Sequence, residues 1–343
     1  MTTRLSVAPA RAGSAILGCG GARGTLVVPN EDIVGPIDSS DEWIRRRTGI
    51  ATRRYATPEQ STVSLAIDAA RDALAHANLA GSDIDTVIVS TVTHFEQTPA
   101  AAVQVADAIG ATPAAAFDIS AACAGYCYGL AQADALVRSG QATHVLVIGA
   151  EKFSDFIDPS DRSISFILGD GAGAVVVGPY EQPRISQTVW GSDGSQCGVI
   201  SQTHSWLTFR DGSDTTWPTL RQEGPTVFKW AAFSMSEVAR TIIDKAGLSP
   251  EDIDVFIPHQ ANMRIIDHMA KTLALRSDCV IARDIADTGN TSAASIPLAM
   301  ERLYRDGLVS GGEIALQIGF GAGLVYAGQV IVLPTAPDGI RHS

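Results

Sequence analysis

Two stretches of this chain share one pattern of apolar and polar positions. Residues 70–88 and 239–257 each predict a helix with an apolar face, a short polar turn and a buried strand. The two predicted strands are Thr86–Ser90 and Val255–Pro258. At a constant offset of 169 residues, eight positions of the two stretches are identical. This self-similarity predicts an internal duplication.

A second match supports two similar halves. The run Gly169–Gly173 aligns with Gly319–Gly323 at an offset of 150, and a β-rich segment follows each run. We therefore expect an N-terminal half over residues 1–180 and a C-terminal half over residues 181–343. Strands that alternate with helices predict an α/β fold, with largely parallel or mixed sheets covered by helices. In such folds, chemistry is expected where the strands end.

One strand-to-helix junction in the first half carries a cysteine. The apolar run 114–119 predicts a short buried strand, and the pattern after Gly125 predicts a helix that stops near Gly140. Cys123 lies between them, close to unpaired N–H groups and the positive end of the helix dipole, which favour the thiolate. Cys123 is therefore a candidate nucleophile. The alternative is an inert buried cysteine, as most free cysteines are.

Composition and charge exclude several classes of protein. The 343 residues are 45% hydrophobic and 18% charged, which is typical of a compact enzyme rather than a disordered chain. A net charge of −12 argues against nucleic acid or an anionic membrane as a partner. No apolar run reaches ~18 residues, so no membrane span is expected.

Cysteine usage indicates a reducing compartment. The five cysteines are odd in number and scattered, and no secretory apolar segment opens the chain, so we expect a cytoplasmic protein without a disulfide framework. Cys123 and Cys127 are four residues apart, but no histidine or carboxylate stands at ligand spacing around them. A metal site is therefore not expected.

Two polar clusters in the second half carry candidate partners for the cysteine. His259 follows the apolar run 255–257, so it is expected at the carboxyl end of a buried strand, over a cleft. Asn290 lies in a turn that opens a helix, where the simpler interpretation is an N-cap. The glycines of 319–323 allow backbone N–H groups to approach a ligand closely. The run 18–24 lacks the dinucleotide-binding glycine spacing, so hydride transfer is not expected.

Five motifs together resemble the β-ketoacyl-acyl-carrier-protein synthase III family. They are Ser39–Ile44, Ala121–Gly125, Phe166–Gly173, Pro258–Asn262 and Gly289–Ser295. The chain is most similar to the actinobacterial members, including those that prime aromatic polyketide synthases. The resemblance extends from about Ala15 to Pro334 and implies the thiolase fold. That fold is a five-layered αβαβα sandwich of two similar halves, in agreement with the duplication.

The resemblance implies a decarboxylative Claisen condensation of an acyl-CoA starter with malonyl-carrier protein, which initiates fatty-acid synthesis. Cys123 accepts the acyl group, while His259 and Asn290 donate hydrogen bonds to the malonyl thioester oxygen as carbon dioxide leaves. The backbone N–H groups of Cys123 and Ala322 form an oxyanion hole. No cofactor is implied, because acyl-CoA is a substrate. Elongating relatives carry a second histidine at the position of Asn290.

Substrate contacts and an oligomeric state also follow from the resemblance. Trp43 and Arg162 match the pair that stacks on the adenine of coenzyme A. Further coenzyme A contacts are matched by Arg47, Phe228, Ala261 and Asn262. The basic patch that receives the acidic carrier protein is matched by Lys229, Arg264 and Lys271. A homodimer is implied as well.

Thr98 bears on the choice of starter. The dipeptide Thr98-Pro99 predicts an N-cap followed by proline at the first helical position. In related enzymes this position reaches across the dimer interface to close the acyl pocket, and phenylalanine there accompanies short pockets. The smaller threonine implies room for branched or longer starters. The alternative is that Thr98 only caps its helix.

Other functions stay open on the sequence alone. A priming synthase of an aromatic polyketide pathway would share every residue named above. A thiol hydrolase or simple acyltransferase would use Cys123 and His259 but would need neither Asn290 nor the release of carbon dioxide. A non-catalytic subunit is disfavoured, because all three residues are present.

Overall fold

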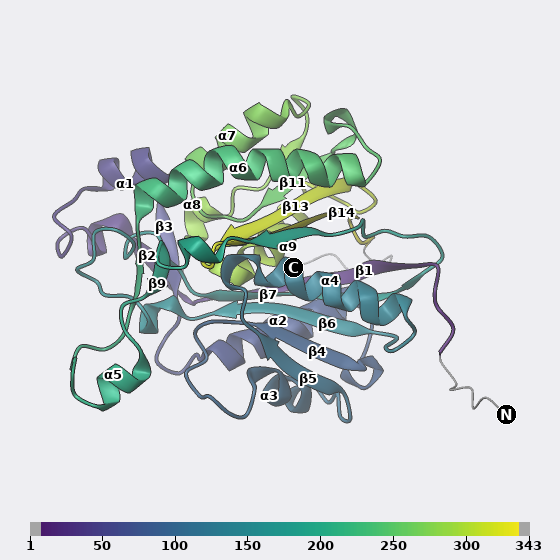
Figure 1. The fold of residues 1–343 in the computed structure, drawn as a ribbon. Coiled ribbons are helices and arrows are strands. Elements are labelled where there is room, and N and C mark those ends of the chain that lie inside the picture. Colours follow the sequence, from purple (N-terminus) through teal and green to yellow (C-terminus); the bar gives the residue numbers. More distant parts are fainter. Residues whose placement is uncertain (1–7, 336–343) are drawn as a thin grey trace.

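Two five-stranded sheets organise the computed structural model, which describes residues 8–335 (Figure 1). The first sheet has the order β1 (Gly13–Arg23), β7 (Gly171–Tyr180), β6 (Val145–Glu151), β4 (Thr86–Ser90) and β5 (Ala115–Ile119). The second has the order β8 (Val189–Ser192), β14 (Val325–Val332), β13 (Ile314–Gly321), β11 (Val255–Pro258) and β12 (Val280–Ile281). Two small ribbons pair β2 (Leu26–Pro29) with β3 (Thr52–Tyr55) and β9 (Ile200–Gln202) with β10 (Leu220–Gln222).

The two sheets have the same topology. Read in these orders, each has two antiparallel pairings followed by two parallel ones. The first sheet uses only strands that end by Tyr180, and the second uses only strands that begin at or after Val189. The predicted strands Thr86–Ser90 and Val255–Pro258 are β4 and β11 and occupy equivalent positions. The predicted duplication and α/β class are therefore confirmed.

The glycine match at an offset of 150 was wrong as a structural equivalence. Gly149 of β6 and Gly319 of β13 hold equivalent places, since a Cβ at each would collide with the backbone around Ala293 and Cys123, respectively. Their cross-strand partners are Gly173 and Ala327. The offset changes because a long loop follows β6, whereas a tight hairpin follows β13.

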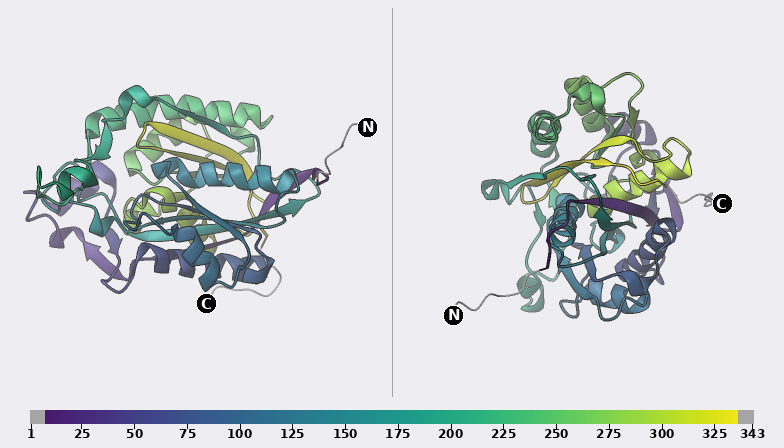
Figure 2. Two further views of the ribbon diagram at one scale, coloured as in Figure 1. Left: turned by 60° about the horizontal axis from the view of Figure 1, so that its bottom comes forward. Right: turned by 90° about the vertical axis from the view of Figure 1, so that its right-hand side faces the viewer.

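Helices complete five layers (Figures 1 and 2). The outer face of the first sheet is covered by α2 (Thr62–Ala77) and α3 (Ala101–Ala108), and that of the second by α6 (Gly224–Lys245) and α7 (Met263–Leu273). Between the sheets, α4 (Gly125–Arg138) and α9 (Ser295–Arg305) contact both. The shorter helices are α1 (Asp41–Thr48), α5 (Trp206–Arg210) and α8 (Ile285–Thr288). Single 3-10 turns are η1 (Asn30–Asp32), η2 (Gly81–Asp83), η3 (Ala122–Ala124), η4 (Phe153–Asp155), η5 (Gly194–Gln196), η6 (Pro250–Asp252) and η7 (Ser292–Ala294).

The central helix α4 follows the pattern expected from its sequence. Leu130, Ala133 and Val137 are fully buried, and Gly140 just beyond the helix has φ +74°, so the predicted stop is confirmed. Burial of a leucine or valine side chain stabilises the fold by roughly 1.5–3 kcal/mol. Every residue of β6 is likewise buried, because helices cover both faces of its sheet. The apolar packing thus fixes α4, and with it the start of the helix next to Cys123.

The strand before Cys123 was predicted to be buried, and this was wrong. β5 lies at the edge of the first sheet and pairs only with β4 among the described strands. Ala115 is exposed, and Phe117 keeps 39% of its surface exposed. An apolar run predicts a strand but not its place in a sheet, and an edge strand has one neighbour fewer.

The predicted N-cap at Thr98 was also wrong. Helix α3 begins at Ala101, and its first two backbone N–H groups, those of Ala101 and Ala102, donate to the Asp118 carboxylate at 2.7 and 2.8 Å. Thr98 is exposed and precedes the helix. The capping oxygen comes from β5, because the carboxylate there reaches the helix start across the fold.

Candidate active site

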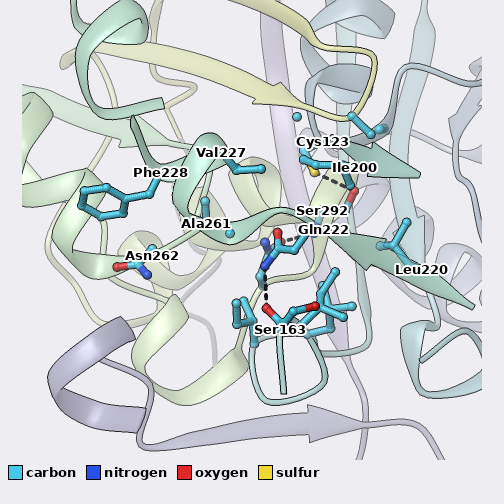
Figure 3. A pocket seen from close by; sticks show the side chains of 18 of the residues that line it. Cys123, Ser163, Ile200, Leu220, Gln222, Val227, Phe228, Ala261, Asn262 and Ser292 are labelled. Atoms are coloured by element: carbon cyan, nitrogen blue, oxygen red, sulfur yellow. Dashed lines mark hydrogen bonds between the residues drawn. The ribbon is translucent and has the colours of Figure 1, made fainter. Parts of the chain in front are cut away.

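One cavity of about 870 Å³ brings the candidate residues of the two halves together. Cys123 reaches it from the junction between β5 and α4, His259 from the end of β11, and Asn290 from the turn before η7. The lining is largely apolar, with most of the remaining residues on the loop after β6 and on β9, β10 and α6 (Figure 3). The three residues predicted from separate parts of the sequence therefore face the same space.

Three hydrogen-bond donors converge on the sulfur of Cys123. The Ser292 hydroxyl donates to Sγ at 3.2 Å (Figure 3), and the backbone N–H groups of Cys123 and Ala322 also donate towards it. Burial nevertheless raises the pKa of the thiol to about 11, because loss of water disfavours the anion more than the donors favour it. The expected preference for thiolate in the free site is therefore wrong.

The duplication explains why Ser292 reaches the cysteine. Turns η3 and η7 are equivalent at an offset of 170, and their first residues, Ala122 and Ser292, have φ +44° and +48°. The two turns contact each other, η3 also contacts β13 of the other half, and η7 contacts β6. Ser292 lay in a recognised motif, but no role was predicted for it. Its equivalence to Ala122, the neighbour of Cys123, is the signal that would have found it.

Close backbone contact places the N–H of Ala322. A Cβ at Gly321 would lie 2.7 Å from the sulfur of Cys123, and one at Gly319 would lie 2.9 Å from the Cys123 carbonyl oxygen. Only glycine leaves room for β13 to pass this close to the cysteine. The predicted approach of these backbone N–H groups to a ligand stays a prediction.

His259 is buried at the end of β11, as predicted, with 2% of its surface exposed. Its Nδ1 lies 2.7 Å from the Ser295 hydroxyl, which also accepts the backbone N–H of Gln260 at 3.3 Å. We assign the Ser295 hydrogen to Nδ1, which places the imidazole proton on Nε2. Burial lowers the pKa of His259 to about 3, so the ring is neutral near pH 7. The sequence motif contained Ser295 but gave no sign of this contact.

Both backbone polar groups of Asn290 are hydrogen-bonded to the loop after β6. Its backbone N–H donates to Ile167 at 2.8 Å, and its carbonyl accepts the N–H of Gly169 at 3.0 Å. Its Oδ1 accepts the backbone N–H of Ser292 at 2.8 Å, so the amide NH₂ is the group left to face the cavity. Helix α9 begins only at Ser295, so Asn290 does not cap it and instead supports turn η7.

The predicted stacking pair lies at the cavity wall, with Trp43 on α1 and Arg162 on the loop after β6. The guanidinium carbons of Arg47 and Arg162 each lie 5.0 Å from the centre of the Trp43 ring, and Phe166 packs edge-on to it at 5.2 Å. Trp43 and Arg162 are therefore adjacent, as expected. A flat base can enter between them only if Arg162 moves off the ring.

The other predicted substrate contacts divide between wall and surface. Phe228, Ala261 and Asn262 line the cavity (Figure 3), and Asn262 also accepts the Arg264 N–H at 2.9 Å as N-cap of α7. Arg264 lies at the wall with its guanidinium 4.9 Å from the Phe228 ring. The predicted patch residues Lys229 and Lys271 are exposed on α6 and α7, and Thr98 is exposed and does not line this cavity.

Two features of the site were missed in the sequence. One wall of the cavity is formed where the loop after β6 is hydrogen-bonded to the β9–β10 ribbon. The Leu220 N–H donates to the Phe156 carbonyl and Gln222 Nε2 donates to the Ser163 carbonyl, both at 2.9 Å. Glu151, at the end of β6, is fully buried and accepts hydrogen bonds from the loop after β4, and burial raises its pKa to about 8. Neither feature has a local motif.

Residues 8–335 contain neither a membrane-spanning helix nor a group of side chains suited to a metal ion. None of the helices there is both long and apolar enough to cross a membrane. In the same part of the chain, no three side chains among histidine, cysteine, aspartate and glutamate form a group suited to a metal ion. The five cysteines are all unpaired.

The duplicated five-layered fold and the cysteine at the junction of its halves define a condensing enzyme of the thiolase fold. Family models match residues 117–194 as 3-oxoacyl-[acyl-carrier-protein] synthase III and 243–333 as its C-terminal part. The β-ketoacyl-[acyl-carrier-protein] synthase III 1 of Streptomyces coelicolor is 55% identical over 329 residues, which cover 93% of this chain and 96% of that relative. The chain therefore belongs to the β-ketoacyl-[acyl-carrier-protein] synthase III family, as the sequence motifs predicted, and is an acyltransferase-type condensing enzyme.

Further relatives and solved structures agree. The synthase III of Kocuria rhizophila is 54% identical over 341 residues, covering 93% of this chain and 96% of that protein. The priming β-ketosynthase from the R1128 polyketide biosynthetic pathway is 45% identical with a TM-score of 0.94, covering 96% of this chain and 99% of that one. The 3-oxoacyl-[acyl-carrier-protein] synthase III of Aquifex aeolicus is 39% identical with a TM-score of 0.85, covering 93% and 100%.

Proposed function

We propose that this enzyme transfers an acyl group from coenzyme A to Cys123 and condenses it with malonyl-carrier protein, releasing carbon dioxide and 3-ketoacyl-carrier protein. The observation that supports this most is the convergence of Cys123, His259 and Asn290 on one cavity. The reaction needs no resident cofactor, because loss of the malonyl carboxylate itself generates the carbanion.

In the first half-reaction, the Cys123 sulfur attacks the acyl-CoA carbonyl. The backbone N–H groups of Cys123 and Ala322, which donate towards the sulfur, stabilise the oxyanion of the tetrahedral intermediate. The thiolate of coenzyme A then leaves, and the proton that Cys123 gave up is balanced by the one that coenzyme A takes up. Ser292 stabilises the attacking thiolate through its 3.2 Å hydrogen bond.

In the second half-reaction, His259 and Asn290 stabilise negative charge on the malonyl thioester oxygen. The Nε2–H of neutral His259 and the amide of Asn290 are the two donors. Carbon dioxide leaves, and the electron pair of the broken bond forms the carbanion, which attacks the acyl-Cys123 carbonyl. The Cys123 thiolate is released and takes up a proton. Ser295 acts as a positioning residue, because it sets the tautomer of His259.

An assay with acyl-CoA starters and malonyl-carrier protein tests the proposal. Wild-type enzyme is expected to release one carbon dioxide for each 3-ketoacyl-carrier protein formed, and Asn290→Ala is expected to condense poorly. A cysteine-dependent hydrolase or simple acyltransferase predicts free acid or acyl transfer without carbon dioxide, and full activity in Asn290→Ala. That result would refute the condensing reaction.

Initiation of fatty-acid synthesis is the proposed pathway, supported by the names and 52–55% identity of the curated relatives. Priming of a polyketide is the second candidate, because one solved priming ketosynthase shares 45% identity and a TM-score of 0.94. Kinetics with the fatty-acid carrier protein and with a polyketide carrier protein separate the two. A preference of tenfold or more for the polyketide carrier would overturn the first candidate.

The substrate contacts are proposed on the same basis. Coenzyme A stacks between Trp43 and Arg162 after Arg162 moves, and Arg47 lies beside the same ring. The remaining wall contacts to coenzyme A are Phe228, Ala261 and Asn262. The basic patch for the acidic carrier protein comprises Lys229, Arg264 and Lys271, and it offsets the repulsion expected from a net charge of −12.

A homodimer and a cytoplasmic location complete the proposal. The exposed apolar edge of β5, with Phe117 39% exposed, supports a dimer, since proteins usually cover such edges. Thr98, exposed just before α3, then reaches the acyl pocket of the partner copy. Sedimentation equilibrium tests the dimer. Five unpaired cysteines support the reducing cytoplasm.

A further inference from the structure

An exposed phenylalanine lies among the residues of the proposed carrier-protein patch. Phe233 keeps 60% of its surface exposed and follows Lys229 by one turn of α6. Its ring packs edge-on against His268 of α7, with the ring centres 5.1 Å apart. The aromatic side chain is thus held in place by its neighbour while much of its surface faces solvent.

Cationic side chains lie near this ring in the sequence of the same two packed helices. On α7, Arg264, His268 and Lys271 follow at spacings of four and three, so they lie along one stripe. Helices α6 and α7 lie side by side on the outer layer (Figure 1). Phe233 contacts the middle of that stripe, and Lys229 lies one turn before it on α6. The result is an apolar centre flanked by three positive side chains.

The anions on the same helices are few near this centre. Asp267 is paired with Arg283 at 2.7 Å, whereas Glu237 is exposed one turn beyond Phe233. At the far end of the two helices, Arg240 donates to the Thr272 carbonyl at 2.9 Å. The positive side chains therefore lie on the first half of α6, at Lys229, and along α7, at Arg264 and Lys271, and on α6 they are bounded by Glu237. It continues into the cavity wall through Arg264, which lies over Phe228.

We propose that Phe233, supported by His268, is the apolar contact on which the acidic carrier protein docks, with Lys229, Arg264 and Lys271 as its charged rim. This inference rests on the proposed function. Charge complementarity and continuity with the cavity wall identify the occupant as the carrier protein. Exposed ion pairs steer association but each contributes little affinity, whereas a desolvated aromatic side chain holds a complex together.

The test compares Phe233→Ala with wild type in two half-reactions. The apparent KM for malonyl-carrier protein is expected to rise about five- to thirty-fold, the range of an interface anchor. Acylation by acyl-CoA and condensation with malonyl-CoA in place of malonyl-carrier protein are expected to stay unchanged. The Phe233→Ala defect should persist at high salt, whereas the defects of Lys229→Glu, Arg264→Glu and Lys271→Glu should shrink as salt screens the charges.

Control variants isolate the ring from general effects. Leu308→Ala removes an apolar side chain that is 56% exposed and lies outside the patch, and it should leave every KM unchanged. Phe233→Leu should retain most of the affinity because it keeps an apolar contact. Glu237→Lys should lower the KM for malonyl-carrier protein, since it removes the bounding negative charge.

Direct binding separates this inference from the proposed reaction. Titration of the holo-carrier protein into wild type and Phe233→Ala reports docking even if no condensation product forms. Weaker binding of the variant supports the docking contact whatever the chemistry. Equal binding, or an equal loss with malonyl-CoA as donor, would overturn it, whereas binding without carbon dioxide release would count against the reaction alone.

Discussion

At Cys123, burial and hydrogen bonding oppose each other. Removal of water raises the pKa of the thiol to about 11, while Ser292 and two backbone donors lower it. The same donors stabilise an anion once it forms, on the sulfur or on the oxygen of a tetrahedral intermediate. The site is therefore built to stabilise charge that develops during the reaction rather than a resting thiolate.

Alkylation of Cys123 should depend steeply on pH. Because its pKa is raised to about 11, the thiolate fraction increases about tenfold for each pH unit between pH 7 and 9. The rate of iodoacetamide labelling, measured by mass spectrometry of the Cys123 peptide, should follow that slope. Cys123→Ser gives the background labelling of the other cysteines. A plateau below pH 8 would show that the helix dipole outweighs burial.

His259 and Asn290 should serve decarboxylation more than acyl transfer. His259→Ala and Asn290→Ala each remove one donor and should lower condensation by about 10²–10³ while still forming acyl-enzyme. Release of labelled carbon dioxide and trapping of labelled acyl-enzyme measure the two steps, with Cys123→Ala as the control that abolishes both. Since the pKa of His259 is lowered to about 3, no histidine inflection is expected between pH 5 and 9. Loss of acylation equal to that of Cys123→Ala would contradict these roles.

Among the elements, β5 and α3 are joined by a single carboxylate. Asp118 is the last residue but one of β5, the strand that leads to Cys123, and it caps α3 by accepting the N–H groups of Ala101 and Ala102. The cap thereby fixes α3 to β5, the edge strand that precedes Cys123. Turns η3 and η7 make a similar connection between the two halves, because each packs on a strand of the other half.

Asp118→Ala should lower the free energy of unfolding by about 1–2 kcal/mol, because two backbone N–H groups lose their acceptor. Urea denaturation followed by circular dichroism measures the change. Thr98→Ala is the matched control, since it removes the hydroxyl that the sequence predicted as the cap, and it should change stability by less than about 0.5 kcal/mol. A larger cost at Thr98 than at Asp118 would contradict the assignment.

In the whole molecule, the proposed role of Thr98 in the acyl pocket rests on the proposed homodimer. Thr98 is exposed in its own chain and does not line the cavity there, so the proposed role needs a partner copy. Helix α3 packs on β5, the strand at the exposed edge of the first sheet. Assembly through this region is what would bring Thr98 to a second cavity.

Branched four- or five-carbon acyl-CoAs should be used at least as well as acetyl-CoA. Each extra buried methylene contributes up to ~0.8 kcal/mol, enough to reorder starters that differ by two or three carbons. Thr98→Phe should shift preference back towards acetyl by filling this space. Competition between starters, scored by mass spectrometry of the 3-ketoacyl products, measures the preference, with Thr98→Ser as the control. Strict selectivity for acetyl in wild type, or an unchanged profile in Thr98→Phe, would exclude this pocket.

Local patterns were enough to predict much of the architecture. The repeated helix–turn–strand pattern predicted β4, β11 and the duplicated halves, and the apolar face of α4 predicted a buried helix ending near Gly140. These features depend on residues within one or two turns of each other, which composition and periodicity describe directly. Motifs around Cys123, His259 and Asn290 predicted the family, and the cavity brings those residues together.

The sequence by itself thus determined the two halves, their repeated elements and the motifs that carry Cys123, His259 and Asn290, because each is encoded by near neighbours in the chain. Only the tertiary structure decided the edge position of β5, the cap of α3 and the contacts of Ser292 and Ser295. The bond from Ser292 to Cys123 spans 169 residues and that from Ser295 to His259 spans 36. The tertiary structure also decided the pKa of Cys123, because burial depends on everything packed around the thiol. No single motif specifies that environment.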